Sequence, residues 1–303
     1  MEIKKVLIIG AGSMGYQIAL QFAIGGFQVA LYDVKADALE FAMTRIKELL
    51  DQLIASKYVK EDKQVVLGRI NATTDKTIAA KDVDLVSESI LEDPEVKGKV
   101  FAEFSKLCPP HAIFTSNTSQ LIPSMFASKT GRPSKFLAWH FGNPVWKENY
   151  VDIMPHPETD PKVVEEVVKV SDKIRQVPFV FHKEFPGYAG NHLLKAYTKA
   201  AMELAANGIL DYKDIDRIWM IAEGKDSLPP FAKMDMMSLD TSCRSLKVAA
   251  ELTGDEFART AANFLEEEFV KKGKLGVKSG EGFYKYPNPE FAQPGFIKKF
   301  TEE

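Results

Sequence analysis

The chain has 303 residues, of which 45% are hydrophobic and 27% are charged. These values are typical of a folded globular protein and the length suits two domains, so extensive disorder is excluded. The formal net charge of -3 excludes a general electrostatic affinity for nucleic acid or for an anionic membrane.

The two cysteines and the N-terminus indicate the compartment. Cys108 and Cys243 lack metal-like spacing, so we expect reduced thiols and no metal site. Near the N-terminus, Lys4-Lys5 leads directly into a strand, without a signal-peptide pattern. No apolar run approaches the ~20 residues that span a bilayer. We therefore expect a cytoplasmic protein, or a matrix protein given without its transit peptide.

The first part of the chain alternates strands and helices. Residues 6–9 form a buried-type strand, residues 14–24 a helix and residues 28–32 a second strand, which together have the size of a βαβ unit. We expect helices at 36–56, 61–70 and 94–107, and strands at 83–87, 112–115, 136–139, 151–154 and 179–181. This alternation predicts an α/β fold with a largely parallel sheet.

After Pro186-Gly187 the strand pattern disappears. Apolar residues from 193 to 205 follow a helical period, and Asp211 can cap the next helix. Further helices are expected at 242–252 and 255–271. We therefore predict a nucleotide-binding domain over residues 1–184 and an all-α domain over residues 185–303.

The segment from Gly10 to Gly15 fits the G-x-G-x-x-G pattern, between a strand and a helix. Gly10 allows the tight turn, Gly12 lets the backbone approach a pyrophosphate, and Gly15 lets the helix pack on the strand. The pyrophosphate would lie on the N–H groups at the helix start, around Ser13 and Met14. The pattern predicts a Rossmann-type dinucleotide site.

Asp33 ends the second strand of this unit. Its carboxylate would accept hydrogen bonds from the adenosine ribose and repel a 2′-phosphate, which favours NAD over NADP. The alternative is a glycine turn without a ligand, with Asp33 as a helix cap.

A histidine and a carboxylate are expected on two consecutive strands. His140 follows one expected strand and Asp152 lies on the next, so the two could meet, and a carboxylate there would fix the imidazole tautomer. Spacing alone leaves a structural role for His140 equally open.

Several separated motifs resemble the 3-hydroxyacyl-CoA dehydrogenase family over essentially the whole length. They are the glycine pattern, Glu92 with Lys97, the run Ser116-Asn117-Thr118-Ser119, His140-Phe141 with Asn143-Pro144, Pro186-Gly187 with Asn191, and the segment from Gly276 to Tyr284. The resemblance implies an NAD-dependent enzyme that interconverts a short-chain L-3-hydroxyacyl-CoA, such as 3-hydroxybutyryl-CoA, and the 3-ketoacyl-CoA, in fatty acid metabolism.

The resemblance also implies the roles of individual residues. His140 would be the general base and Asp152, where the family usually has glutamate, would orient it. Ser119 and Asn191 would hydrogen-bond the reacting oxygen and the histidine region. Glu92, Lys97 and Asn117 are assigned to the cofactor, and Asn143, Ser56 and Lys57, with Ser119, to the substrate. Plainer readings stay open: Ser119 as a turn residue, Asn191 as a helix cap and Lys97 as a solvated charge.

Three departures affect the substrate side. The lysine-rich segment that helps relatives hold CoA reads Ile54-Ala55-Ser56-Lys57-Tyr58, the usual Gly-Pro-Phe reads Pro229-Pro230-Phe231, and the usual Asn-Arg pair reads Asn191-His192. Two other stretches, Leu121-Ile122-Pro123-Ser124 and Pro155-His156-Pro157-Glu158-Thr159, resemble the λ-crystallin and L-gulonate 3-dehydrogenase branch of the same superfamily. The alternatives are therefore the same chemistry on a free 3-hydroxy acid, L-gulonate-like or carnitine-like, or a catalytically silent NAD-binding structural protein.

The resemblance further implies a homodimer paired through the C-terminal helices. The apolar run from Met234 to Leu239 supports this weakly, since a Met-rich stripe is more often core than interface.

Overall fold

The computed structural model describes residues 2–297. The chain divides into two compact units, one ending at Ala189 and the other beginning at Gly190. The predicted boundary between residues 184 and 185 lies shortly before this division and stays a prediction.

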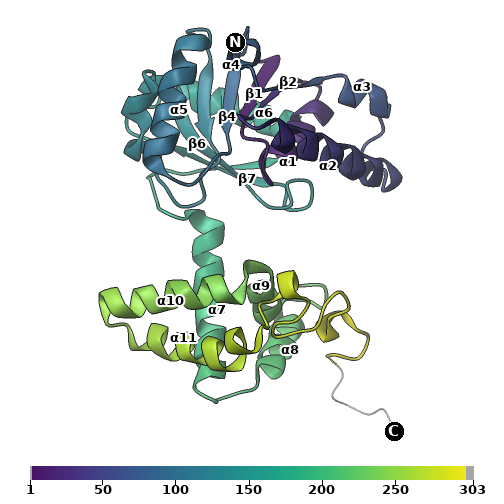
Figure 1. Cartoon of the computed structure of the whole chain (residues 1–303), viewed down its shortest axis with the longest axis vertical. Coiled ribbons are helices and arrows are strands. Elements are labelled where there is room, and N and C mark those ends of the chain that lie inside the picture. The colour runs from purple at the N-terminus through teal and green to yellow at the C-terminus, as the bar shows by residue number, and fades with distance from the viewer. Residues whose placement is uncertain (1, 298–303) are drawn as a thin grey trace. The chain divides into compact units, whose positions relative to one another are not determined.

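The first unit is a sheet covered by helices on both faces (Figure 1). Its strands are β1 (Lys5–Ile9), β2 (Gln28–Tyr32), β3 (Ile70–Thr73), β4 (Leu85–Glu88), β5 (Ile113–Ser116), β6 (Phe136–Phe141), β7 (Tyr150–Pro155) and β8 (Val177–Val180). Its helices are α1 (Gly15–Ile24), α2 (Ala36–Ala55), α3 (Lys63–Leu67), α4 (Lys76–Ala80), α5 (Pro94–Leu107) and α6 (Pro161–Lys173). Short 3-10 helices lie at Pro123–Met125, Ala127–Thr130 and Pro133–Lys135.

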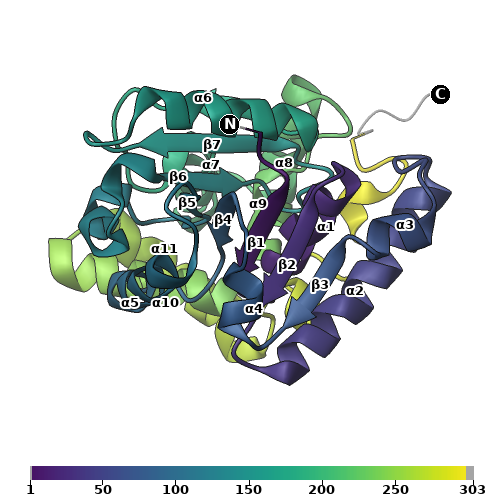
Figure 2. The ribbon, with the colours of Figure 1, turned by 90° about the horizontal axis from the view of Figure 1, so that it is seen from above.

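The 8-stranded sheet has the order β3-β2-β1-β4-β5-β6-β7-β8. All pairings are parallel except that of β6 with β7 (Figure 2). Side chains of β1 alternate between two cores: Val6 and Ile8 pack with α1, α2 and α6, whereas Leu7 and Ile9 pack with α4 and α5. This alternation is what a sheet buried on both faces requires, and the predicted doubly wound, mostly parallel fold is confirmed.

The helix expected over residues 61–70 is confirmed only over residues 63–67 and is wrong at its C-terminal end. Asp62 caps α3, but Gly68 ends it, and Ile70 begins β3, which pairs with Val29 of β2. Residues 70–73 are only partly buried at the edge of the sheet, so they lack the apolar run that marks the inner strands. Helices α4 and α6 were not predicted, although Asp160 followed by Pro161 is a recognisable helix start.

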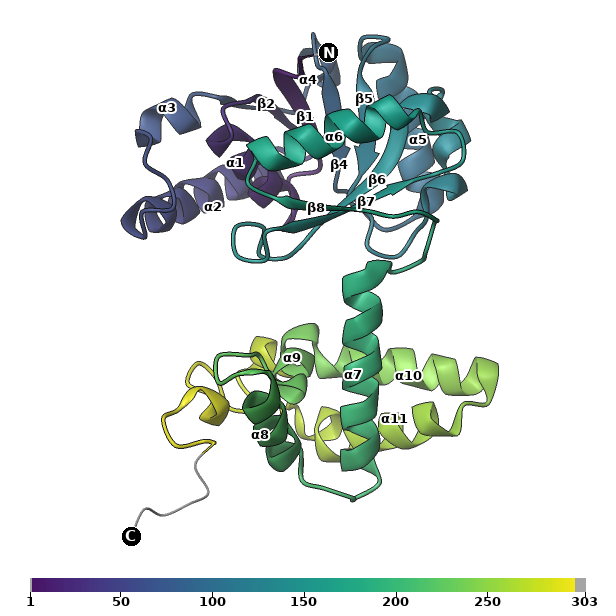
Figure 3. The same ribbon diagram turned by 180° about the vertical axis from the view of Figure 1, so that it is seen from behind.

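The second unit is helical, and this prediction is confirmed for its described residues (Figure 3). It contains α7, which begins just before the division (Tyr188–Ala206), α8 (Tyr212–Glu223), α9 (Pro230–Met237), α10 (Leu239–Thr253) and α11 (Glu256–Glu268), with 3-10 helices at Val270–Lys272, Val277–Ser279 and Glu290–Ala292. Asp211 caps α8 as predicted, by accepting from the N–H of Lys213.

The C-terminal segment, residues 276–286, folds onto two buried carboxylates. Asp235 accepts from the N–H groups of Phe283 and Tyr284 at 2.8 and 2.9 Å, and Asp216 accepts from the hydroxyl of Tyr284 at 2.7 Å. A Cβ at Gly276 or Gly282 would overlap with atoms of Asp235. The glycines of this motif therefore allow the segment to approach Asp235 closely.

Candidate active site

The glycine loop joins β1 to α1 and leaves room for a ligand. Gly10 has φ +100°, and a Cβ there would come 2.6 Å from the carbonyl oxygen of Ser89, while a Cβ at Gly15 would overlap with the carbonyl of Gly10. Gly12 differs because a Cβ there would meet no protein atom within 4 Å. The protein's own packing thus explains Gly10 and Gly15, whereas Gly12 suits the close approach of a pyrophosphate.

The start of α1 fits an anionic group. Gly12 and Ser13 are exposed, and Met14, the N-cap residue, makes no side-chain capping hydrogen bond. Backbone N–H groups at such a helix end favour phosphate oxygens. The predicted roles of Gly12, Ser13 and Met14 are therefore compatible with this geometry.

Asp33 lies against the same loop. Its Oδ2 accepts from the N–H of Ala11 at 2.9 Å and its Oδ1 from the N–H of Lys35 at 3.0 Å. The N-cap of α2 is Lys35, so Asp33 is not the capping residue. The carboxylate is held beside the glycine loop, and its role at the ribose stays a prediction.

Gln17 connects α1 to the loop after β6, a role that the sequence did not indicate. Its Nε2 donates to the carbonyl of Ser13 at 2.8 Å and to Oδ1 of Asn143 at 3.3 Å, and its Oε1 accepts from the N–H of Val145 at 3.1 Å. Asn143, which is exposed, thereby lies near the first turn of α1.

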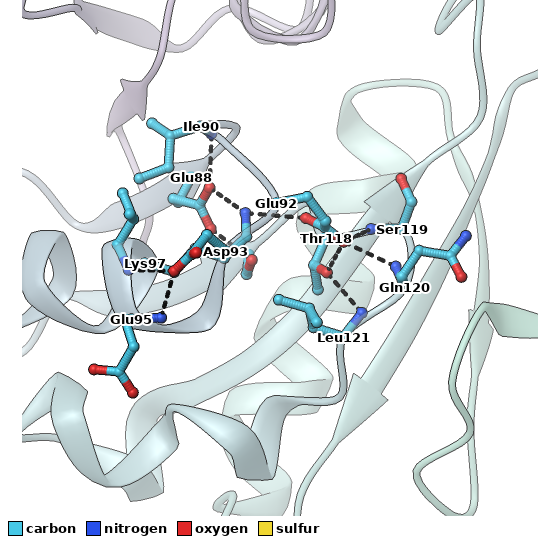
Figure 4. Close-up of polar contacts among 12 residues, drawn as sticks. Glu88, Ile90, Glu92, Asp93, Glu95, Lys97, Thr118, Ser119, Gln120 and Leu121 are labelled. Carbon is cyan, nitrogen blue, oxygen red and sulfur yellow. Dashed lines mark hydrogen bonds and ion pairs between the residues drawn. The ribbon is translucent and has the colours of Figure 1, made fainter. Parts of the chain in front are cut away.

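Lys97 is not a solvated charge, so that reading is wrong. The side chain is 1% exposed, and its Nζ lies 2.6 Å from Glu88 Oε1 and 3.3 Å from Glu92 Oε2 (Figure 4). One buried ammonium thus bridges two carboxylates, that of Glu88 at the end of β4 and that of Glu92 in the loop after it.

Glu88 was missed from the sequence because a carboxylate within a strand gives no sign of its partners. It is fully buried, and its Oε2 accepts from the hydroxyl of Ser116 at 2.6 Å. Burial raises the pKa of Glu88, against the lowering effects of Lys97, Ser116 and the N–H of Ile90. The residue ties the end of β4 to the end of β5 and to the first turn of α5.

Glu92 organises the loop after β5. Its Oε1 accepts from the hydroxyl of Thr118 and from the N–H groups of Ser119 and Gln120, the last two at 2.9 Å (Figure 4). Its partial burial raises its pKa, but the hydrogen bond from Thr118 and the charge of Lys97 prevail, so the pKa of Glu92 is lowered overall. The carboxylate is therefore ionised and holds the backbone of Ser119 in place.

Asn117 joins this loop to the strand of the histidine. Its Oδ1 accepts from the N–H of Phe141 at 2.9 Å, directly after His140. The run from Ser116 to Ser119 and the end of β6 are thus one connected structure at the carboxyl ends of parallel strands, where open α/β sheets bind ligands.

His140 and Asp152 are direct partners in the antiparallel pairing of β6 with β7. Nδ1 of His140 lies 3.3 Å from Oδ2 of Asp152, and the two residues are 8% and 3% exposed. A carboxylate can only accept, so a neutral imidazole that donates to it from Nδ1 would leave Nε2 as the basic atom. His156 lies outside this pair. Its ring contacts the carbonyl of Pro133 and the N–H of Glu158, and its backbone N–H donates to the hydroxyl of Thr159.

Tyr188 covers the imidazole of His140, and the sequence did not single it out. The two rings are stacked with centroids 4.6 Å apart and planes inclined by 14°. Tyr188 follows Pro186-Gly187, so its place after a recognised motif was the available signal.

Three predicted site residues lie outside these contacts. Ser56 and Lys57 are exposed at the C-terminal end of α2, and within residues 2–297 no hydrogen bond or ion pair joins them to the residues above. Asn191 lies on α7 in the second unit, so its hydrogen bond to the reacting oxygen stays a prediction.

Residues 2–297 contain no group of three or more His, Cys, Asp or Glu side chains able to hold a metal ion. Among their helices, none is both long and apolar enough to cross a membrane.

Two family models match the chain. The 3-hydroxyacyl-CoA dehydrogenase NAD binding domain matches residues 5–185, and the C-terminal domain of the same family matches residues 187–286. A curated protein of Deinococcus radiodurans, described as a probable 3-hydroxybutyryl-CoA dehydrogenase, is 32% identical over 279 residues, which cover 92% of this chain and 99% of that protein.

Two solved structures are also similar over nearly the whole chain. A diketoreductase, described as catalysing reactions of dicarbonyl compounds, is 37% identical, with a TM-score of 0.84 and coverage of 94% of this chain and 100% of its own. The (S)-3-hydroxybutyryl-CoA dehydrogenase of Ralstonia eutropha is 28% identical, with a TM-score of 0.82 and coverage of 95% and 100%.

Proposed function

The chain belongs to the 3-hydroxyacyl-CoA dehydrogenase family and is an NAD-dependent oxidoreductase, and we propose that it interconverts a short-chain L-3-hydroxyacyl-CoA, such as 3-hydroxybutyryl-CoA, and the 3-ketoacyl-CoA. The observation that carries the proposal is the buried His140–Asp152 pair on the sheet edge that also carries the glycine loop. The family assignment sets aside a catalytically silent NAD-binding protein.

In this proposal His140 is the general base. When bound, NAD supplies the acceptor for the hydride that leaves the hydroxyl-bearing carbon. Nε2 of His140 takes the hydroxyl proton, and Asp152 stabilises the imidazolium that results. In the reducing direction the same imidazolium returns the proton to the ketone oxygen.

The remaining predicted residues hold the reactants. Ser119, whose backbone Glu92 fixes, would hydrogen-bond the reacting oxygen together with Asn191. Lys97 is already paired with two carboxylates, so we propose that it and Glu92 act on the nicotinamide side mainly by shaping the loop around Asn117. The loop that Gly10 and Gly15 shape would hold the rest of the cofactor, with Gly12 and Ser13 at the pyrophosphate and Asp33 at the ribose.

A second candidate is the same chemistry on a substrate without CoA. The similarity to a diketoreductase at 37% identity favours it, as does the segment from Ile54 to Tyr58, in which Lys57 is the one cation. Lys147, exposed in the loop that also carries Asn143, could then face a substrate carboxylate.

The test is a comparison of substrates by NADH absorbance at matched concentrations. Reduction of acetoacetyl-CoA is compared with reduction of a β-diketone and with oxidation of L-gulonate, L-carnitine and 3-hydroxybutyrate. We expect kcat/KM to be highest with the CoA thioester. Turnover of free acids or diketones alone would replace the first candidate by the second, and the absence of turnover with all of them would contradict both.

The homodimer, the cytoplasmic location and a place in fatty acid metabolism stay predictions.

A further inference from the structure

The imidazole of His140 is in contact with two different kinds of group. Oδ2 of Asp152 lies 3.3 Å from Nδ1 at the ring edge, whereas the ring of Tyr188 is stacked on one ring face, with centroids 4.6 Å apart. The hydrogen bond and the stack therefore restrict different motions of the same ring.

The hydrogen bond to Asp152 restricts the ring incompletely. At 3.3 Å it is longer than the common N–H···O distance of about 2.9–3.0 Å. The χ2 torsion of histidine has broad minima, so a single long contact at Nδ1 leaves the ring able to rock about the Cβ–Cγ bond. Such rocking would move Nε2, which lies on the far side of the ring.

Tyr188 is itself held firmly. It is fully buried, it packs with Ala138 and Met154, and its ring meets Phe181 edge-on at 5.9 Å. Its φ of 57° lies in the left-handed region, at a cost of about 1–2 kcal/mol for a non-glycine residue. The surrounding packing keeps a ring in this position despite that cost.

We propose that Tyr188 is a positioning residue for His140, whose stacked ring fixes the imidazole plane so that Nε2 points to the reacting hydroxyl. The proposal rests on the proposed function of His140 as the base. It assigns the role to the aromatic ring rather than to the phenol group, since the stack needs only the ring.

The hydroxyl of Tyr188 has no hydrogen-bond partner among the described residues. Burial, and to a smaller extent the negative charges of Glu92 and Asp152, raise the pKa of Tyr188, so the hydroxyl keeps its proton. A buried donor without a partner destabilises the protein by about 1–3 kcal/mol. Removing the oxygen should therefore leave the stack intact and should not lower stability.

Three variants separate the ring from general packing. Tyr188→Phe keeps the ring, Tyr188→Leu removes it, and Phe181→Leu removes an aromatic ring from the same cluster without removing the stacked one. We expect Tyr188→Leu to lower kcat by about 10- to 100-fold, because small misplacements of catalytic groups have effects of this size. The KM for NAD should stay unchanged, and the other two variants should remain within about threefold of the wild type.

A second measurement does not depend on turnover. In the proton NMR spectrum of histidine-labelled protein, the ring current of Tyr188 should shift the His140 signals upfield. These signals are assigned by their loss in His140→Gln. The shift should persist in Tyr188→Phe and disappear in Tyr188→Leu. If the wild type turns over no substrate, the proposed function fails, but this measurement still tests the stack.

Four results would overturn the proposal. They are unshifted His140 signals in the wild type, full kcat in a folded Tyr188→Leu variant, an equal loss of kcat in Tyr188→Phe, or an equal loss in Phe181→Leu. The wild-type spectrum keeps the proposal testable even if Tyr188→Leu does not fold.

Discussion

Pairing register decides whether a short side chain can reach its partner. His140 and Asp152 are directly opposed across β6 and β7, and such residues have Cα atoms only about 4.5–5.5 Å apart. Asp152 therefore reaches Nδ1 of His140 at 3.3 Å although it is one methylene shorter than the glutamate common in the family.

The role proposed for His140 predicts that its replacement slows the reaction. His140→Gln should lower kcat by about 10²–10⁴-fold, the usual contribution of a general base. NADH binding, followed by fluorescence titration, should not change. His182→Gln, at an exposed histidine, is the control. Near-normal turnover in a folded His140→Gln variant would exclude His140 as the base.

The role proposed for Asp152 depends on its negative charge. Asp152→Asn should lower kcat by about 100-fold or more, because an amide cannot stabilise the imidazolium by charge. Asp152→Glu, which keeps the charge, should stay within about tenfold of the wild type. Both are measured by initial rates over a pH series. Equal kcat values for the two variants would argue against a charge effect.

At the scale of elements, buried charges join segments that are distant in the sequence. Glu88 on β4, Lys97 on α5 and Ser116 on β5 meet in one network, and Glu92 extends it to the next loop. Each group depends on the others, since a buried charge without its partner is strongly unfavourable.

We predict that Lys97→Met destabilises the first unit by about 3–5 kcal/mol, because Glu88 loses its counter-charge. Adding Glu88→Gln should recover much of this loss. The control is Lys129→Met, whose ion pair with Glu95 is exposed and is expected to contribute less than about 1 kcal/mol. Urea unfolding monitored by circular dichroism measures all three. A cost for Lys97→Met no greater than the control's would contradict the network.

The contacts of the C-terminal segment predict a pH effect. Burial raises the pKa of Asp216 to about 7 and that of Asp235 to about 6, in each case against hydrogen bonds that lower it. These values lie above the ordinary value of about 3.9 for the unfolded chain, so the folded form binds the protons more tightly. The stability that these groups contribute is present below about pH 4 and is lost as the pH rises through about 6–7.

Asp216→Asn should remove part of this loss. The amide oxygen can still accept from the N–H of Phe231, and the amide N–H group can donate to Tyr284. The free energy of unfolding of the variant, relative to the wild type, should rise between pH 5 and pH 7.5, by about 1.4 kcal/mol per pH unit below the pKa of about 7. Thermal unfolding across this range measures it, with the exposed Glu223→Gln as control. A pH-independent difference would contradict the prediction.

At the scale of the whole molecule, the second unit exposes large apolar side chains on four helices. They are Leu193 and Leu204 on α7, Ile218 and Ile221 on α8, Met236 and Met237 on α9, and Val248 and Leu252 on α10. The Met-rich run from Met234 to Leu239 is only partly exposed. Met236 and Met237 are exposed, whereas Met234 and Leu239 are buried in the core. Apolar exposure on this scale is common at protein interfaces.

The predicted homodimer can be tested on this surface. Light scattering at micromolar concentration should show a dimer for the wild type. Ile221→Glu and Leu252→Glu, at side chains 65% and 80% exposed, should weaken association at least about tenfold, equivalent to 1.4 kcal/mol. Val34→Glu, at a side chain 76% exposed in the first unit, is the control. A monomeric wild type would refute the dimer.

The sequence by itself determined the features that depend on local chemistry. The buried run before Gly10, the glycine spacing and Asp33 at the end of a strand were enough for the doubly wound fold and the cofactor, because turn, helix end and strand end follow one another along the chain. The helical second unit followed from apolar periodicity. The edge strand β3 was not predicted, because it is only partly buried and lacks the apolar run of the inner strands.

Only the tertiary structure decided which side chains meet. Lys97 has the same sequence surroundings whether it faces water or Glu88, and nothing local to Tyr188 shows that it lies on His140. The approach of Asp152 to His140 depends on strand register, and that of Asp235 to Gly282 on the packing of distant segments. These contacts join residues far apart in the chain, and pairings of that kind are set by the packing of the whole core rather than by any local pattern.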